Sequence, residues 1–154
     1  MILENARYPI IALANNALYV YLRVGAIIKC YRGLISETFQ ETIFIDSDSS
    51  LWRCESVKVA RSIIPLWKRL FVADLVEVDL HLSEPKKIAS VDIVKQMISK
   101  CAQRAQSFVL DTGDHTFESE RNIVILNKVK QCINSAETVR DVIDGIQEII
   151  KKNG

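Results

Sequence analysis

Residues 75–82 read Leu-Val-Glu-Val-Asp-Leu-His-Leu, and this stretch is the strongest indication of the fold class. Val76, Val78, Leu80 and Leu82 fall on alternate positions, and charged or polar residues separate them. Because successive side chains of a strand point to opposite faces of a sheet, this alternation predicts a β-strand with one apolar and one polar face. The stretch therefore predicts a sheet that other elements cover on one side only.

The sequence before this strand predicts two hairpins and a short helix. Asn15-Asn16 and the polar stretch 46–50 are typical turn residues, and β-forming runs flank each of them. Gly33 is a plausible stop for a helix whose apolar residues recur at helical spacing. Residues 62–71 stay ambiguous, because Pro65 fits only the first turn of a helix. The expected elements are strands at 9–14 and 18–22, a helix over residues 24–35, and strands at 43–45 and 51–57.

The sequence after Pro85 predicts helices. Ser90 is a good N-cap, and a continuous apolar stripe runs from Val91 to Ala105. A polar loop is expected at residues 111–115, and helical spacing predicts a second helix over residues 119–133. Ser135 is the expected N-cap of a last helix. The apolar face of that helix comprises Val139, Val142, Ile143, Ile146, Ile149 and Ile150.

Length and composition are those of one globular domain. The 154 residues predict a single α+β domain, residues 1–154, in which a mostly antiparallel sheet from the first half packs against helices from the second half. Hydrophobic residues make up 49% and charged residues 25%, which argues against a disordered chain. The 20 basic and 19 acidic residues give a net charge of +1, so we expect neither nucleic acid nor a membrane as the partner.

Several features predict a cytoplasmic protein. The start of the chain lacks a basic region followed by a long apolar run, so it predicts no secretory signal. No apolar stretch approaches the roughly 18–20 residues of a membrane-spanning helix. The cysteines stand far apart without a C-x-x-C pair, which favours buried thiols in a reducing compartment over zinc or disulfides. These cysteines are Cys30, Cys54, Cys101 and Cys132.

One segment carries residues that suit catalysis. Val109–Gly113 matches the apolar-apolar-Asp-Thr-Gly signature of aspartic proteases, in which two aspartates share one proton. It lies between two predicted helices and lacks the downstream apolar-apolar-Gly element, so an ordinary loop is the favoured interpretation. His115 and Glu118 have a spacing that suits two metal ligands on one helical face. The alternative function is therefore a metal-assisted hydrolase or protease-like enzyme that uses Asp111, Asp114, His115 and Glu118.

Basic residues and tryptophans alternate in the middle of the chain. Lys58, Arg61, Lys68 and Arg69 occur with Trp52 and Trp67. Such a mixture can bind RNA or acidic lipid. Nearby acidic residues balance these charges, so a solvated basic edge is the favoured interpretation.

The order of elements resembles that of small immunity proteins, which protect bacteria from the toxic domains of their own contact-dependent or polymorphic toxins. The resemblance begins with Tyr8–Leu13, the turn Asn15-Asn16, the strand at Leu18–Tyr21 and the short helix after it. Ile45–Trp52 is similar to the recurrent hairpin of these proteins, and the layout continues to about Ala105. Residues after Asp111 have no counterpart in this layout.

The resemblance implies a non-enzymatic inhibitor, without a cofactor, that binds one cognate toxin domain and blocks its active site. The chain departs from many nuclease inhibitors of this kind, because it is electrically balanced rather than acidic. Attraction of the toxin would then depend on local acidic patches. The expected contact residues are Asp46, Asp48, Trp52, Glu77 and Asp79. A third interpretation, a self-associating structural subunit, stays open, because an amphipathic helical half can pair with itself.

Overall fold

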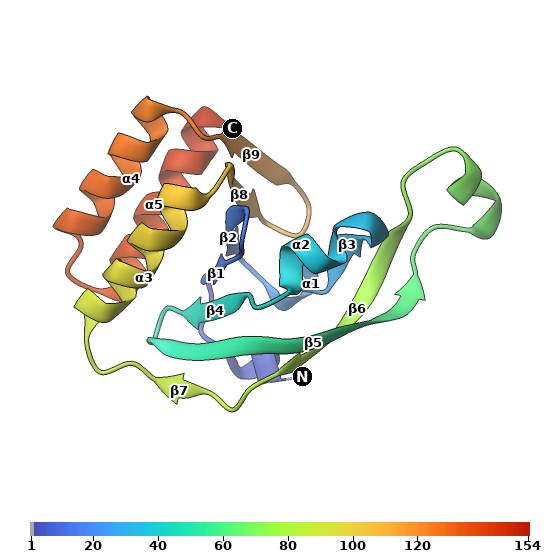
Figure 1. Cartoon of the computed structure of the whole chain (residues 1–154), viewed down its shortest axis with the longest axis horizontal. Coiled ribbons are helices and arrows are strands. Elements are labelled where there is room, and N and C mark those ends of the chain that lie inside the picture. The colour runs from blue at the N-terminus through green and yellow to red at the C-terminus, as the bar shows by residue number, and fades with distance from the viewer. Residues whose placement is uncertain (1) are drawn as a thin grey trace.

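The computed structural model describes residues 2–154 and shows a curled, mostly antiparallel sheet with helices from the second half of the chain packed against it (Figure 1). The α+β prediction is thus confirmed. The strands are β1 (Ile10–Leu13), β2 (Ala17–Tyr21), β3 (Lys29–Tyr31), β4 (Ile43–Asp46), β5 (Ser50–Ser62), β6 (Leu75–Leu82), β7 (Lys86–Lys87), β8 (Ser107–Asp111) and β9 (Thr116–Glu120). The α-helices are α1 (Val24–Ile27), α2 (Ile35–Phe39), α3 (Val91–Arg104), α4 (Ile123–Ser135) and α5 (Val139–Asn153). Short 3-10 helices are η1 (Ile2–Asn5), η2 (Arg32–Leu34) and η3 (Leu66–Leu70).

The sheet has the strand order β3-β6-β5-β4-β1-β2-β8-β9, and β7 pairs with β5. Within residues 2–154, neighbouring strands run antiparallel except β2 and β8, which run parallel. A parallel pair needs a long crossover between its strands, and the segment from β3 to α3 provides it. The two halves of the chain therefore meet in the middle of one sheet.

Both faces of the central strands are buried. Ile11 and Leu13 of β1 pack with the helices α3, α4 and α5, whereas Ile10 and Ala12 face a second core on the other side. The second core is completed by residues of η1, α1, α2 and the strands β4 to β6. The sequence predicted a sheet that is covered on one side only. This is correct for β6, whose Asp79 and His81 are exposed, but it is wrong for the centre of the sheet.

The first half contains the predicted hairpins but not the predicted single helix. β1 with β2 and β4 with β5 form antiparallel pairs about the expected turns. Residues 24–35 instead divide into α1, the edge strand β3 and η2, and α2 follows. Cys30 is buried between exposed Lys29 and Tyr31, and it lies opposite Val76 of β6. Pairing with β6 thus overrides the helical spacing of the sequence.

The second half differs from the prediction between α3 and α4. Residues 107–120 form the hairpin β8–β9 rather than a loop and the start of a helix. Ser90 caps α3 as predicted, because its hydroxyl accepts the N–H of Asp92. The cap of α5 is Thr138, which forms a capping box with Asp141, and not Ser135, which is the last residue of α4. None of the helices in residues 2–154 is long and apolar enough to cross a bilayer.

The hairpin of β5 and β6 projects beyond the body of the protein (Figure 1). Residues 63–74 connect the two strands; we call residues 63–73, which contain η3, the tip. β5 pairs with β4 over Leu51–Arg53 and with β6 from Cys54, opposite Leu82, to Ser62, opposite Val76. The 13 residues of β5 thus connect the central sheet to the tip.

All four cysteines are free thiols; Cys30, Cys54 and Cys101 are buried and Cys132 is half-buried. Burial raises the pKa of the Cys54 thiol from 9.0 to about 11, and the nearby Glu55 adds to this rise. Burial also raises the pKa of the Cys101 thiol to about 11. The folded protein therefore holds these protons more tightly than the unfolded chain does.

Alkaline pH should destabilise the protein in the window between pH 9 and about 11. Below pH 9 both states keep the thiol protons, so the full stability is present; above it the unfolded chain ionises first, and stability falls until the folded pKa is reached. For Cys101 the expected loss is on the order of 2 kcal/mol. Urea unfolding at the two ends of this window measures it. Cys101→Ala should show a shallower decline, and an equal decline would contradict the role of this thiol.

Candidate functional site

The Asp-Thr-Gly segment forms the turn between β8 and β9. The Asp111 carboxylate accepts the N–H of Gly113 at 2.8 Å, and Gly113 has a φ of 87°. The Thr112 hydroxyl oxygen accepts the N–H groups of Asp114 and His115. Strands flank the motif, so its expected position between two helices is wrong. Its polar groups stabilise the turn through local hydrogen bonds.

The alternative catalytic set does not converge. Asp114 forms an ion pair with Arg23 at 2.7 Å, and His115 is exposed at the end of the turn. Glu118 lies on β9 opposite Val109, so the expected helical spacing of His115 and Glu118 is absent. Within residues 2–154, no three His, Cys, Asp or Glu side chains lie close enough to hold a metal ion.

Two of the expected contact residues are buried. Asp46 is 2% exposed, and its carboxylate accepts the N–H groups of Arg7, Asp48 and Ser50. Trp52 is 4% exposed and packs in the second core. Each of these side chains is therefore enclosed by its own fold in this structure, and a contact with a partner stays a prediction.

The other expected contact residues lie at the surface but apart from one another. Asp48, in the turn before β5, forms an ion pair with Arg7 at 3.2 Å. Glu77 pairs with Arg61 at 2.8 Å, and Asp79 lies opposite Lys58 in the second half of β5. These three carboxylates lie towards opposite ends of β5, and neighbouring cations offset two of them. They do not form one acidic patch.

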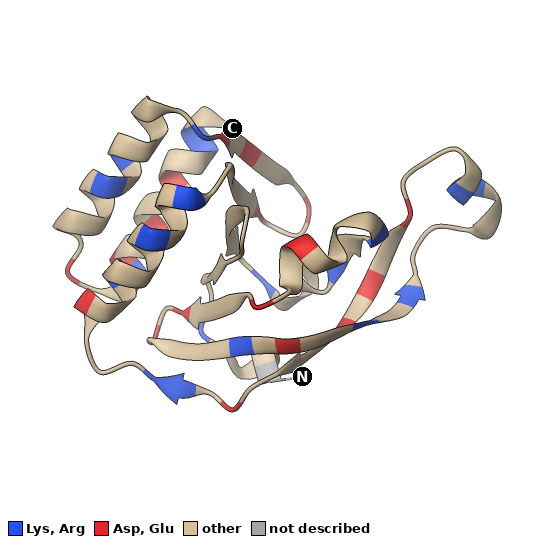
Figure 2. Ribbon diagram, in the orientation of Figure 1, with Lys and Arg blue, Asp and Glu red and all other residues tan. Residues whose placement is uncertain are grey.

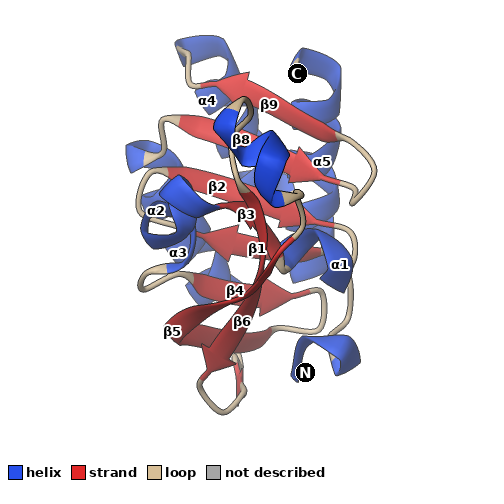
Figure 3. Ribbon diagram, turned by 90° about the vertical axis from the view of Figure 1, so that its right-hand side faces the viewer, coloured by secondary structure: helices blue, strands red, loops and turns tan. Residues whose placement is uncertain are grey.

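A half-open groove of about 570 Å³ crosses the face of the sheet opposite α3, α4 and α5. β2, β8 and β9 form its floor, while β3, η2 and α2 form its wall; Figure 3 shows β3 and α2 in front of these strands. Tyr19 and Tyr21 stack on the floor with ring centroids 5.6 Å apart and an interplanar angle of 4°. Side chains that line the groove include Tyr19, Tyr21, Lys29, Tyr31, Leu34, Glu37, Thr38, Val109, Asp111, Thr116 and Glu118.

The groove carries an excess of negative charge. Among the described residues that line it, Glu37, Asp111 and Glu118 are acidic and Lys29 is basic. Burial raises the pKa of Tyr19; Thr38 opposes this rise through a hydrogen bond, and Cys30, Glu118 and Glu37 add to it. Carboxylates from α2 and β9 thus act on one phenol from opposite sides of the groove. The phenol stays neutral at physiological pH and is able to donate a hydrogen bond.

Sequence reasoning found two of these carboxylates but assigned them to another chemistry. Asp111 and Glu118 were candidates only under the alternative function, as catalytic or metal-binding groups, whereas Tyr19, Tyr21 and Glu37 were not singled out. The alternation of Tyr19 and Tyr21 along β2 was the available signal, since residues two apart share one face of a strand. Nothing local to Glu37 places it opposite Glu118, because that pairing follows from the sheet order.

Comparison with known proteins adds no template for this groove. The chain matches no family model, no curated protein and no solved structure. Inferences about function accordingly depend on the groove, its charges and the exposed surfaces of this chain.

Proposed function

We propose that the protein is a non-enzymatic protein-binding module, and most specifically an immunity protein that binds and neutralises a cognate bacterial toxin domain. The observation that carries the proposal is the half-open groove with tyrosines on its floor and three carboxylates against one lysine. The order of elements in the first half resembles that of immunity proteins, and this resemblance is the reason to propose a toxin domain as the partner.

The chemistry of the groove suits a protein surface. Tyrosine is enriched at protein interfaces, because its ring buries a large apolar area while its hydroxyl makes a hydrogen bond. Tyr19 and Tyr31 supply this property from β2 and β3, and the buried Tyr21 supports the ring of Tyr19 from below. Asp111 and Glu118 contribute as acidic lining of the groove in this proposal and not as a reacting centre.

The charge of the groove suits a basic partner. Complementary charge steers association and suppresses wrong partners. A toxin that acts on nucleic acid needs Lys and Arg on its working surface to contact phosphates. An acidic groove complements such a surface. The local charge of the groove can therefore attract a basic toxin, although the whole chain carries a net charge of only +1.

Binding to the product of the adjacent upstream gene tests the proposal. If that product is a toxin, its catalytically inactive form should bind the full chain at submicromolar concentration in calorimetry. Glu37→Lys with Glu118→Lys should weaken this binding about tenfold or more, equivalent to about 1.4 kcal/mol. The matched control is Glu84→Lys with Glu148→Lys, which reverses two exposed charges outside the groove and should leave binding unchanged.

Two results would count against the proposal. A neighbouring gene that encodes no toxin, together with no binding at submicromolar concentration, would remove the immunity function. Equal loss of binding in the groove variant and in its control would show that net charge, and not the groove, determines the interaction.

A further inference from the structure

The tip of the β5–β6 hairpin exposes a large apolar surface. The exposed fractions are 75% for Leu66, 65% for Trp67, 83% for Leu70, 83% for Phe71 and 50% for Val72. Single exposed apolar side chains are ordinary on a soluble protein, but a contiguous group of this size marks an interaction site. These residues all lie in η3 or directly after it, so they gather at the end of the hairpin.

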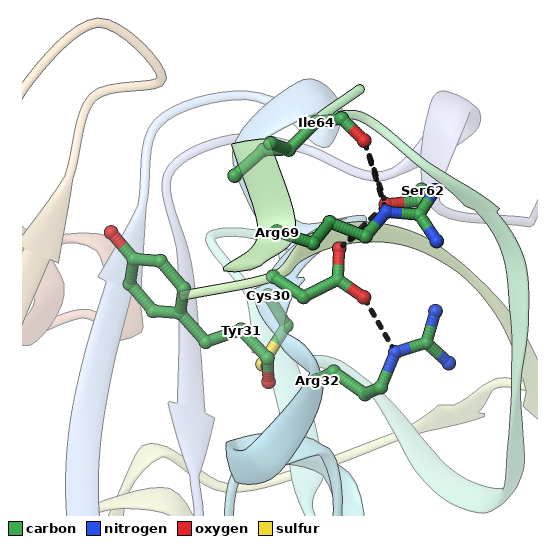
Figure 4. Close-up of polar contacts among 7 residues, drawn as sticks. Cys30, Tyr31, Arg32, Ser62, Ile64 and Arg69 are labelled. Atoms are coloured by element: carbon green, nitrogen blue, oxygen red, sulfur yellow. Dashed lines mark hydrogen bonds and ion pairs between the residues drawn. The ribbon is translucent and has the colours of Figure 1, made fainter. Parts of the chain in front are cut away.

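The tip is held in a defined conformation by polar contacts at its base (Figure 4). The Asp74 carboxylate accepts hydrogen bonds from Arg32 Nε at 2.7 Å and from the Ser62 hydroxyl. Arg69 Nε donates to the carbonyl oxygen of Ile64 at 3.1 Å and lies 3.7 Å from Asp74. A surface that is already ordered loses less conformational entropy when it binds. The tip is therefore pre-organised for contact.

The tip is cationic as well as apolar. Residues 63–73 contain Lys68 and Arg69 and no acidic residue. Figure 2 shows basic but no acidic residues on η3. The nearest acid in sequence, Asp74, is engaged by Arg32, Arg69 and Ser62, so it does not cancel the charge of Lys68. A complementary site needs apolar or aromatic surface together with carboxylates.

The groove of the same protein has this complementary chemistry. Its tyrosines offer aromatic surface, and Glu37 and Glu118 are exposed carboxylates at its wall and floor. Its volume of about 570 Å³ lies within the roughly 300–1,000 Å³ of pockets that enclose small ligands. Large side chains such as those of Trp67 and Phe71 therefore match the groove in size and in chemistry.

We propose that the tip of one copy of the chain docks in the groove of a second copy, and that the second copy reciprocates. In Figure 3 the tip lies in front of the sheet, and β3, which contributes to the wall of the groove, lies in front of the sheet as well. A copy related by a two-fold axis in front of the sheet presents its own tip to the groove. Such an isologous dimer closes with two identical contacts.

The area is sufficient for a stable dimer. Complete burial of one aromatic side chain removes about 150–250 Å² from water. Each tip contributes two aromatic and three aliphatic side chains, exposed by 50–83%, and symmetry buries this set twice. Together with the groove surface that they cover, the interface reaches the lower part of the range of about 1,200–2,000 Å² typical of specific complexes. Lys68 then lies near the carboxylates of the groove.

This inference goes beyond the proposed function, since self-association does not require the toxin. The two are linked through the groove: a groove filled by a tip cannot accept a toxin at the same time. The free protein is then a dimer in which the tip of each copy occupies the groove of the other, and toxin binding separates the two copies. Loss of the dimer and loss of toxin binding remain separate measurements.

Sedimentation equilibrium of the full chain tests the dimer over micromolar to submillimolar concentrations. The expected mass is twice the monomer mass of 17.5 kDa. Trp67→Ser with Phe71→Ser should raise the dissociation constant of the dimer about a hundredfold or more, because these side chains contribute most of the apolar contact. Both side chains are largely exposed, so the folded monomer should keep its stability.

Two further variants identify the surfaces. Glu118→Lys should weaken the dimer about tenfold, and Lys68→Glu added to it in the same chain should restore association, since the two reversed charges attract again. The matched control is Ile123→Ser with Val124→Ser, which removes exposed apolar side chains from α4 and should leave the dimer intact.

Several outcomes would overturn the inference. A monomer at every concentration, or a dimer that the α4 control weakens as much as the tip variant does, excludes docking of the tip in the groove. A dimer that depends on the tip but not on Glu118 would place the tip elsewhere. A monomer that cosediments with vesicles of phosphatidylserine and phosphatidylcholine, and loses this binding in the tip variant, would assign the tip to a membrane surface.

Discussion

Replacing Asp46 by alanine should lower the free energy of unfolding by about 3–5 kcal/mol, because hydrogen bonds to a charged acceptor are worth about 1.5–3 kcal/mol each and the donors would be left without a partner. The Asp46 carboxylate accepts the N–H groups of Arg7 at 3.0 Å, Asp48 at 3.0 Å and Ser50 at 2.8 Å. It thereby holds the β4–β5 turn, in which Ser49 has a φ of 65°, and ties that turn to the segment before β1. Urea unfolding, with an unchanged dependence on denaturant, measures the loss.

Asp48→Ala is the matched control, two residues away in the same turn. Its carboxylate is half-exposed and pairs with Arg7, so its removal should cost less than about 1 kcal/mol. Asp46→Asn, which keeps one acceptor oxygen without the charge, should fall between the two. Equal losses for Asp46→Ala and Asp48→Ala would mean that the turn does not depend on the buried carboxylate.

Asp46 also illustrates why a polar stretch cannot be divided into contact residues and structural residues from sequence. Asp46 and Asp48 are the same residue type in one turn, and both were expected to face a partner. Asp46 is the last residue of β4 and points into the fold, whereas Asp48 points to solvent. The two differ in what they contact on Arg7, 39 positions from Asp46: Asp46 accepts its backbone N–H, whereas Asp48 pairs with its exposed side chain.

Elements with a strong local pattern were predictable. The alternation in Leu75–Leu82 is that of β6, whose apolar residues pack in the second core and whose Asp79 is exposed. Ser90 caps α3 as its position indicated, and the apolar stripe of α5 is buried at Val142, Ile143 and Ile146. Each pattern matches the period of its element.

Elements that depend on distant pairing were not predictable. Phe108, Val109 and Leu110 are three consecutive buried residues in β8, and a short apolar run of this kind does not distinguish a strand from a helix. Its strand conformation follows from pairing with β2, about 90 residues earlier, and with β9. The Asp-Thr-Gly turn was misplaced for the same reason.

The groove and the tip are functional surfaces that the sequence alone does not predict. Glu37 and Glu118 reach one groove only through the sheet order, so no spacing in the sequence connects them. The tip did carry a signal, because residues 63–73 are mostly apolar between two β-rich stretches. An apolar run usually predicts a buried segment, and its exposure at the end of a projecting hairpin depends on the length of β5.

Replacing Gly145 by alanine should destabilise the protein by about 2 kcal/mol, although alanine is favoured over glycine inside a helix by about 1 kcal/mol. Gly145 lies in the middle of α5, where it faces α4. A Cβ atom at this position would collide with the Sγ atom of Cys132. Overpacking costs about 1–3 kcal/mol, since the Cys132 side chain or the helix must shift, and here it outweighs the gain in helix propensity. Thermal or urea unfolding gives the difference directly.

The expected loss of stability depends on one atom, the Sγ atom of Cys132. Cys132→Ala removes the Sγ atom and leaves a Cβ atom 3.7 Å from the new methyl group, which is an ordinary contact. The double variant Cys132→Ala with Gly145→Ala should therefore be at least about 1 kcal/mol more stable than Gly145→Ala alone, so the two changes are strongly non-additive. If Gly145→Ala by itself stabilises the protein, then α4 and α5 lie farther apart than their contact through Cys132 requires.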